Sequence, residues 1–273
     1  MKKFLSVLLA LGLAVSATAC AGGASSSSEA ASSEPEATPA AESEAATSEA
    51  AAATGEVMTY DEYMAAAVDE AVTIESCVQA KQSYYAEQGT ATVYLQDEDG
   101  AYFAYDMACT QEEYDQMTEG TRIRVSGYKA EWSGEIEIMD GQLDEILEGD
   151  TYVAEPLDVT ELLGTDELES HQNEKVKFTG LTVAPSTIEG DTTEYAFLYN
   201  YDGSGTQGDD VYFNVEYNGE KYQFLVESYL CDSESEVYKA VEALEIGQTI
   251  DCEGFLYWYE GVNPHITSVT VAG

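Results

Sequence analysis

Positive charge is what this sequence has least of. The 273 residues include 10 Lys and Arg against 53 Asp and Glu, which gives a formal net charge of -43. Proteins that bind nucleic acids gain most of their affinity by neutralising phosphates with Lys and Arg. Anionic membrane surfaces attract basic segments for the same reason. The composition therefore predicts that nucleic acid is an unlikely partner.

Long hydrophobic runs are also missing. The longest apolar stretch, residues 4–15, is too short to span a bilayer, and it follows Lys2 and Lys3. This order is typical of a signal peptide, here residues 1–19. The stretch Ala17-Thr18-Ala19-Cys20 resembles a bacterial lipobox. That resemblance implies a lipid on Cys20 and an extracytoplasmic protein anchored to the bacterial cell membrane. An ordinary signal-peptidase site is the alternative.

The chain lacks the motifs of common catalytic centres. His171 and His265 are its only histidines, and neither belongs to an H-E-x-x-H site. There is no G-x-S-x-G elbow, phosphate-binding P-loop or C-x-x-C pair. The acidic loops 97–99 and 202–210 could hold Ca²⁺, and the second superficially resembles a calcium loop, but Gln207 and Phe213 stand where its Gly and closing Glu belong, so we expect solvated charged loops. We therefore predict no enzyme activity, cofactor or metal, although a hydrolase with two distant carboxylates stays open.

We predict that residues 20–57 form a tether, because this segment has almost no large hydrophobic side chains. From 20 to 55 there are six Glu, many Ala and Ser, and no aromatic or basic residue. Such a segment cannot bury enough apolar surface to offset its ordering entropy. We expect a disordered spacer between the lipid and the folded part.

The remaining residues divide into two domains, 58–148 and 149–273. Thr59-Tyr60-Asp61-Glu62 predicts a capping box that opens a short helix. Apolar alternation and turn residues then predict the elements of the first domain. They are strands 71–79, 90–96 and 101–106, a helix at 110–119, and strands 121–130 and 134–139.

The second domain repeats this order. Asn218-Gly219 is a strong hairpin signal. Cys109 and Cys231 both precede a helix, and Gly127 and Gly254 both interrupt the strand that follows it. We expect helical turns at 158–163 and 166–172, strands at 175–183, 195–201, 211–217 and 222–227, a helix at 233–244, and strands at 249–258 and 265–271.

Five strands with a helix between the third and fourth is the order of the OB-fold, a small barrel. The stretches 94–97, 120–127, 131–134 and 169–174 resemble the OB-fold domains of bacterial secreted proteins and lipoproteins, which are often described as nucleic-acid-binding-like. The sequence thus predicts a mainly β protein with two tandem OB-fold-like five-stranded barrels.

Aromatic residues gather at the last hairpin of each predicted barrel. They are Trp132 in the first barrel and Tyr257, Trp258 and Tyr259 in the second. OB-folds bind ligands beside this loop, so we predict these four residues as ligand-binding, with cross-strand packing as the alternative. Consecutive strand residues alternate between faces, so at least one ring of 257–259 should be exposed.

The basic residues and the cysteines of the two predicted barrels indicate structural roles. Arg122 and Arg124 share one strand face, as do Lys175 and Lys177, and we expect ion pairs with nearby acids. An oxidising compartment permits one disulfide per barrel, Cys77–Cys109 and Cys231–Cys252, and four free thiols are the alternative.

These inferences predict a lipid-anchored, non-catalytic binding module whose ligand is a glycan, a peptide or an envelope protein. The first alternative is an OB-fold oligonucleotide binder. The second is a cell-envelope hydrolase.

Overall fold

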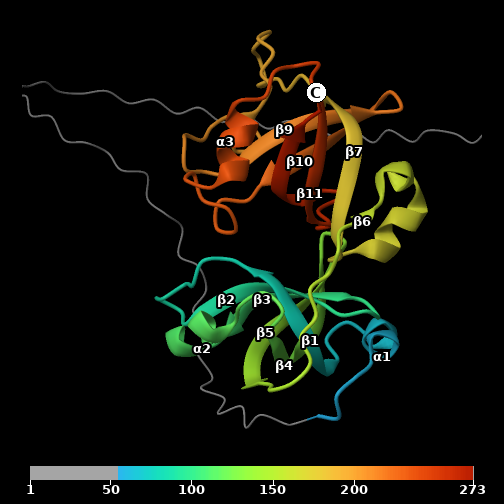
Figure 1. Ribbon diagram of the computed structural model, residues 1–273, viewed down its shortest axis with the longest axis vertical. Helices are drawn as coiled ribbons and strands as arrows, with labels where there is room; N and C mark the ends of the chain where they lie inside the picture. Colours follow the sequence, from blue (N-terminus) through green and yellow to red (C-terminus); the bar gives the residue numbers. More distant parts are fainter. Residues whose placement is uncertain (1–54, 273) are drawn as a thin grey trace, which may run out of the picture. The chain divides into compact units, whose positions relative to one another are not determined.

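Strand pairing closes the first part of the chain into a five-stranded barrel (Figure 1). The computed structural model describes residues 55–272. The barrel order is β1-β2-β3-β5-β4, closed by the antiparallel pair β1–β4, and α2 connects β3 to β4. Its elements are α1 (Tyr60–Ala65), β1 (Ala71–Lys81), β2 (Thr90–Gln96), β3 (Ala101–Ala108), α2 (Gln111–Gln116), β4 (Arg122–Trp132) and β5 (Glu135–Ile146).

The second barrel repeats this topology with two short additional strands. β7, β11, β12, β10 and β9 follow one another, and the β7–β9 pairing closes the ring. In both barrels the third and fifth strands pair in parallel. The elements are β6 (Leu157–Asp158), η1 (Thr160–Leu162), η2 (Asp166–His171), β7 (Lys175–Ala184), β8 (Leu198–Tyr199), β9 (Val211–Tyr217), β10 (Glu220–Val226), α3 (Glu236–Glu242), β11 (Thr249–Phe255) and β12 (His265–Val271).

The prediction of two OB-fold-like barrels, each with a helix between its third and fourth strands, is confirmed. Local signals explain this success. The Thr59 hydroxyl accepts the Glu62 N–H and the Glu62 carboxylate accepts the Thr59 N–H, which is the expected capping box. Asn218 and Gly219 both have positive φ and form the tight β9–β10 hairpin.

The chain before β9 departs from the prediction in one place. The expected strand 195–201 is reduced to the two residues of β8. The helical turns expected at 158–163 and 166–172 are the 3₁₀ helices η1 and η2. Asp158 accepts hydrogen bonds from the backbone N–H and the hydroxyl of Thr160, and Gly164 takes a positive φ immediately afterwards. This turn chemistry keeps the segment short.

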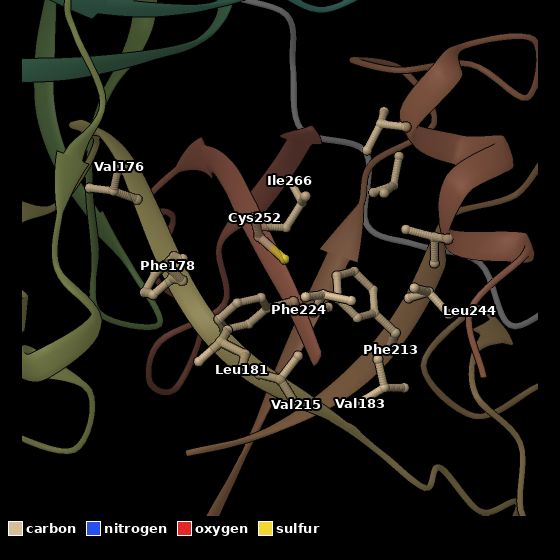
Figure 2. Packing of buried hydrophobic residues seen from close by; sticks show 14 of the residues in the cluster. Val176, Phe178, Leu181, Val183, Phe213, Val215, Phe224, Leu244, Cys252 and Ile266 are labelled. Atoms are coloured by element: carbon tan, nitrogen blue, oxygen red, sulfur yellow. The ribbon is translucent and has the colours of Figure 1, made fainter. Parts of the chain in front are cut away.

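Aromatic and branched side chains fill the second barrel (Figure 2). Phe213 and Phe224 come from adjacent strands, and the Phe224 ring lies 4.8 Å from that of Phe178, centroid to centroid. Alternate residues of β9 are buried, as the period of a strand with one core face requires. Burial of these apolar side chains is the main stabilising contribution to the folding of this barrel.

Gly127 and Gly254 occupy equivalent bulges in the two barrels. The β4–β5 register shifts between Ser126 and Tyr128, and the β11–β12 register shifts between Glu253 and Gly254. A Cβ on Gly127 would lie 2.6 Å from Ile138 Cγ2, and one on Gly254 would overlap the His265 carbonyl. Glycine is needed at both places because the next strand approaches too closely for a side chain.

All four described cysteines are free, so neither predicted disulfide, Cys77–Cys109 or Cys231–Cys252, is formed. Cys77 pairs with Gln96 at one end of β2, whereas the Cys109 N–H bonds Gly89, just before the other end. The length of β2, about 20 Å, therefore separates them, while a disulfide joins Cα atoms about 4.4–6.8 Å apart. Cys252 is buried in the second core.

The predicted signal peptide, the lipidation site Cys20 and the tether up to residue 54 lie outside the described residues. Among residues 55–272, no helix is both long and apolar enough to cross a membrane.

Candidate binding cleft

The two barrels belong to one compact unit and share a small aromatic core. Tyr94 of β2 and Phe255 of β11 stack with ring centroids 4.5 Å apart, and Phe103 packs beside them. The Tyr94 hydroxyl is hydrogen-bonded to His265 Nδ1 at 2.5 Å. Because Tyr94 is fully buried, this contact holds β2 of the first barrel against β12, the last strand of the second.

The β4–β5 hairpin tip of the first barrel is held by backbone and side-chain groups of the second. Gln172 donates from Nε2 to the Gly134 carbonyl and accepts from Ile136 N–H, at 2.8 and 3.1 Å. The Trp258 N–H donates to the buried Glu135 carboxyl at 2.8 Å, and the Glu260 N–H donates to the Ser133 carbonyl. These bonds bring the β4–β5 turn beside the β11–β12 connection.

A cleft opens next to this junction, and its first wall belongs to the first barrel. The wall includes Tyr84 and Tyr85 from the β1–β2 loop, Phe103 and Tyr105 from β3, and Trp132 from the end of β4. The Ser83 N–H donates to the Tyr229 carbonyl at 2.8 Å, which ties this loop to the opposite wall.

The second wall comes from the equivalent places of the second barrel. Tyr201 lies in the β7–β9 connection and Tyr212 on β9. Tyr229 follows β10, while Tyr257 and Tyr259 lie in the β11–β12 connection. The Tyr257 ring stacks on His265 at 4.3 Å between centroids.

Both walls are therefore the surfaces that OB-folds use for ligands, namely the face of the second and third strands and the two loops beside it. The cleft has a volume of about 1110 Å³. Small-molecule pockets usually have about 300–1,000 Å³, so this cleft has room for an extended ligand.

Exposed aromatic rings are concentrated here. Of the seven Tyr, Trp and Phe residues classed as exposed among residues 55–272, six line the cleft, and they are 42% to 69% exposed. They are Tyr85, Tyr105, Trp132, Tyr201, Tyr229 and Tyr259. The seventh, Tyr128, lies elsewhere on β4. Exposed apolar surface gathered in one place usually marks a binding site.

Three of the four aromatic residues predicted as ligand-binding line the cleft. Trp132 and Tyr259 are exposed and Tyr257 is half-buried, so the expected exposure of a ring in 257–259 is confirmed. Trp258 is not in the lining. It packs against the second core and lies over Gly134, where a Cβ would come within 2.8 Å of its Cδ1. The structure therefore gives Trp258 a packing position.

The sequence prediction missed the other exposed rings of the cleft. Tyr105 could have been found, because it follows Phe103 by two residues on the same predicted strand. Tyr201 and Tyr229 lie in connections, and nothing local indicates that they would meet the first barrel.

No Lys or Arg is among the described residues that line the cleft. Arg122 forms a bidentate pair with Asp97, and Arg124 contacts Glu75 and Glu145, as the sequence predicted. Lys129 donates to three carbonyls at the end of α1. Lys175 pairs with Glu119.

Carboxyl groups take part in the lining instead. Asp106, Asp210, Glu227 and Glu260 all line the cleft. Burial, followed by the charge of Asp210, raises the pKa of Glu227 to about 7. Burial lowers the pKa of His265 to about 3, so its imidazole is neutral at physiological pH. The described lining of the cleft is thus aromatic, rich in hydrogen-bond acceptors and without Lys or Arg.

The described residues include no group of three or more His, Cys, Asp or Glu arranged to hold a metal ion. The acidic loops at 97–99 and 202–210 accordingly form no such cluster. Asp97 instead pairs with Arg122, and Asp202 accepts a hydrogen bond from the Ser204 N–H.

No protein-family model and no curated protein sequence matches the chain. Solved structures that resemble it include a murine DNA-binding protein bound to double-stranded DNA, with 13% identity, TM-score 0.34, and coverage of 74% of this chain and 96% of that one. Another is a replication protein A heterotrimer bound to single-stranded DNA, with 12% identity, TM-score 0.30, and coverage of 74% of this chain and 49% of that one. A third is a deletion mutant of the single-stranded DNA-binding protein from Thermus aquaticus, with 14% identity, TM-score 0.24, and coverage of 74% of this chain and 93% of that one.

These similarities correct the sequence prediction. The main interpretation was a binding module for a glycan, a peptide or an envelope protein, with nucleic acid an unlikely partner. The three structures are described as DNA-bound or DNA-binding proteins, so this expectation is withdrawn, and the alternative of an oligonucleotide binder is taken up below as a proposal. The likeness is one of fold, so the function is argued below from the cleft itself.

Proposed function

We propose that this protein binds single-stranded oligonucleotides in the cleft between its barrels, mainly by stacking bases on the exposed aromatic rings. The observation that carries this proposal is the concentration of six of the seven exposed aromatic residues in that one cleft. Stacking on aromatic side chains contributes about 1–3 kcal/mol per base and tolerates any base, because every base has a π-face.

The charge of the cleft determines how the strand lies. Carboxyl groups repel phosphates, and no Lys or Arg lines the described part of the cleft. The bases must therefore point inward and the phosphates toward solvent. A duplex hides its bases in the stack, so a single strand is the form that fits.

Binding can be measured with a fluorescently labelled single strand and the full chain. We expect Tyr105→Ala and Tyr259→Ala each to weaken binding by about 1–3 kcal/mol, which is a factor of about 5–150. Tyr128→Ala is the matched control, because Tyr128 is equally exposed but lies outside the cleft. The proposal fails if the parent protein does not bind single strands, or if Tyr128→Ala is as damaging as Tyr259→Ala.

We further propose that Cys20 carries a lipid anchor and that the binding domains are extracytoplasmic. Support comes from the basic start, the short apolar run and the Ala17-Thr18-Ala19-Cys20 motif. Cys20→Ala should release the protein from membranes or leave its signal peptide uncleaved. A Cys20→Ala protein that is processed and membrane-bound like the parent would contradict the anchor.

The proposed role is binding without catalysis. No metal cluster occurs among the described residues, and the histidine of the cleft, His265, is buried and bonded to Tyr94. After incubation with the protein, the oligonucleotide should be recovered at its full length. Shortened products would indicate a hydrolase.

A further inference from the structure

Glu227 differs from Asp106 and Asp210, two other carboxyl groups of the cleft, in its hydrogen bonding. Asp210 Oδ1 accepts the N–H and the hydroxyl of Ser228, and Asp106 Oδ1 accepts the Thr90 hydroxyl. Glu227 Oε2 is buried and has no hydrogen-bond partner among the described residues. Of the buried polar atoms without a partner in this part of the chain, it is the one whose residue lines the cleft.

A buried acceptor without a donor costs free energy, so folded proteins retain few of them. Glu227 directly follows β10, whose pairing with β9 fixes its position. Tyr105 and Tyr212, from the two walls, line the cleft together with Glu227. A base stacked between the walls would thus bring its edge toward this carboxyl group, which must turn toward the cleft to present the buried Oε2.

We propose that the cleft prefers bases with an exocyclic amino group, and that the Glu227 carboxylate accepts a hydrogen bond from that group. This inference rests on the proposed function, since it requires that bases enter the cleft. Cytosine, adenine and guanine each carry such a donor, and carboxylates accept from the N4 amine of cytosine. Thymine and uracil present a carbonyl oxygen at the equivalent position, which a carboxylate repels.

The environment of Glu227 predicts a pH dependence for this preference. The groups around it are Asp210 before β9, Tyr212 on β9, Tyr94 on β2, Tyr105 on β3 and Cys231 after β10. All five are neutral or negative near neutral pH, so none of them stabilises a carboxylate, and the backbone N–H groups of Tyr229 and Leu230 offset the effect of burial only in part. The pKa of about 7 means that Glu227 becomes fully ionised only above neutral pH. Preference for the amino group should therefore increase as the pH rises through that value.

Short strands of deoxycytidine and deoxyuridine test the inference with the full chain. The two strands have the same phosphates and differ in the amine at C4 of cytosine. Above the pKa of Glu227 we expect the cytosine strand to bind about tenfold more tightly or better, as a hydrogen bond to a charged acceptor allows. Below about pH 7, where Glu227 becomes protonated, the ratio of the affinities for the deoxycytidine and deoxyuridine strands should decrease.

Glu227→Gln removes the charge and offers an amide donor, so it should reduce the cytosine preference to near unity. Glu220→Gln is the matched control, because Glu220 starts the same strand and lies outside the cleft. It should keep the preference. If both strands bind equally, or if Glu227→Gln keeps the parent ratio, the base preference is wrong while the proposed function stands. If neither strand binds, the proposed function itself is wrong.

Discussion

The two barrels share a framework and differ in the loops around the cleft. In the first, residues 82–89 connect β1 to β2, and a two-residue turn, 133–134, connects β4 to β5. In the second, the equivalent connections are residues 185–210, which include β8, and residues 256–264. Three of the four carboxyl groups of the cleft, Asp210, Glu227 and Glu260, come from the second barrel.

The fourth strands show which positions the fold constrains. Ile123 and Ile250 are both fully buried, and Gly127 and Gly254 both form bulges. Arg122 and Arg124, which pair with acids, correspond to Thr249 and Asp251. Core and bulge positions are thus repeated, while surface positions have diverged. The long loops of the second barrel supply two of the four carboxyl groups of the cleft, Asp210 and Glu260, and Glu227 follows β10 of the same barrel.

The largest expected effect comes from truncating the shared core. Ile123→Ala and Ile250→Ala each leave a cavity in their barrel and should lower the free energy of unfolding by about 2–5 kcal/mol. Chemical denaturation of the two variants measures both losses. A near-neutral effect at one of the two positions would break the equivalence of the barrels.

A somewhat smaller effect is expected at the junction, where Glu135 joins the barrels. Burial raises the pKa of Glu135 to about 8, so the folded protein keeps a proton that the unfolded chain loses above about pH 4.5. Stability from this group therefore falls as the pH rises, by about 2–3 kcal/mol between roughly pH 6 and pH 9.

Glu135→Gln keeps an oxygen for the Trp258 N–H and cannot ionise. The variant should lose less stability than the parent over that pH range, as denaturation at several pH values would show. Glu137 and Glu227, whose pKa values burial also raises to about 7, leave a remaining pH dependence of the same sign. An unchanged pH dependence in Glu135→Gln would contradict the buried position of this carboxyl group.

The smallest structural effect is expected at the bulges. Gly127→Ala and Gly254→Ala place a methyl group against the neighbouring strand and should each cost about 1–3 kcal/mol. Gly254 abuts His265 at the base of the cleft, so Gly254→Ala should also weaken oligonucleotide binding, whereas Gly127→Ala should not. Equal binding by the two variants would indicate that the bulge does not position the cleft.

Much of the fold could be predicted because its signals are local. Strands 90–96, 211–217 and 265–271 match the observed bounds, and the Thr59 cap and the Asn218-Gly219 turn depend on neighbouring residues alone. The strand expected at 195–201 was wrong because apolar aromatic residues there suggested pairing that is limited to β8.

The cleft was only partly predictable because it depends on contacts between the barrels. Trp132, Tyr257 and Tyr259 could be placed from their position at the hairpins. The packing position of Trp258 follows from its contact with Gly134, which lies in the other barrel. Glu227 is one acid among 53 Asp and Glu residues in the sequence, and it is distinguished by its place in the cleft and its unpartnered buried oxygen, which depend on the fold.

The central proposal is that bases, and not phosphates, hold a single strand in an aromatic cleft whose described lining has no Lys or Arg. The most direct test is to measure the affinity of the full chain for one labelled single strand over a range of salt concentrations. The account predicts an affinity that is flat or rises with salt, because salt screens the repulsion between phosphates and carboxylates. An affinity that falls steeply, with a slope of about −0.7 per neutralised phosphate on logarithmic axes, would show that Lys and Arg hold the strand and would contradict the account.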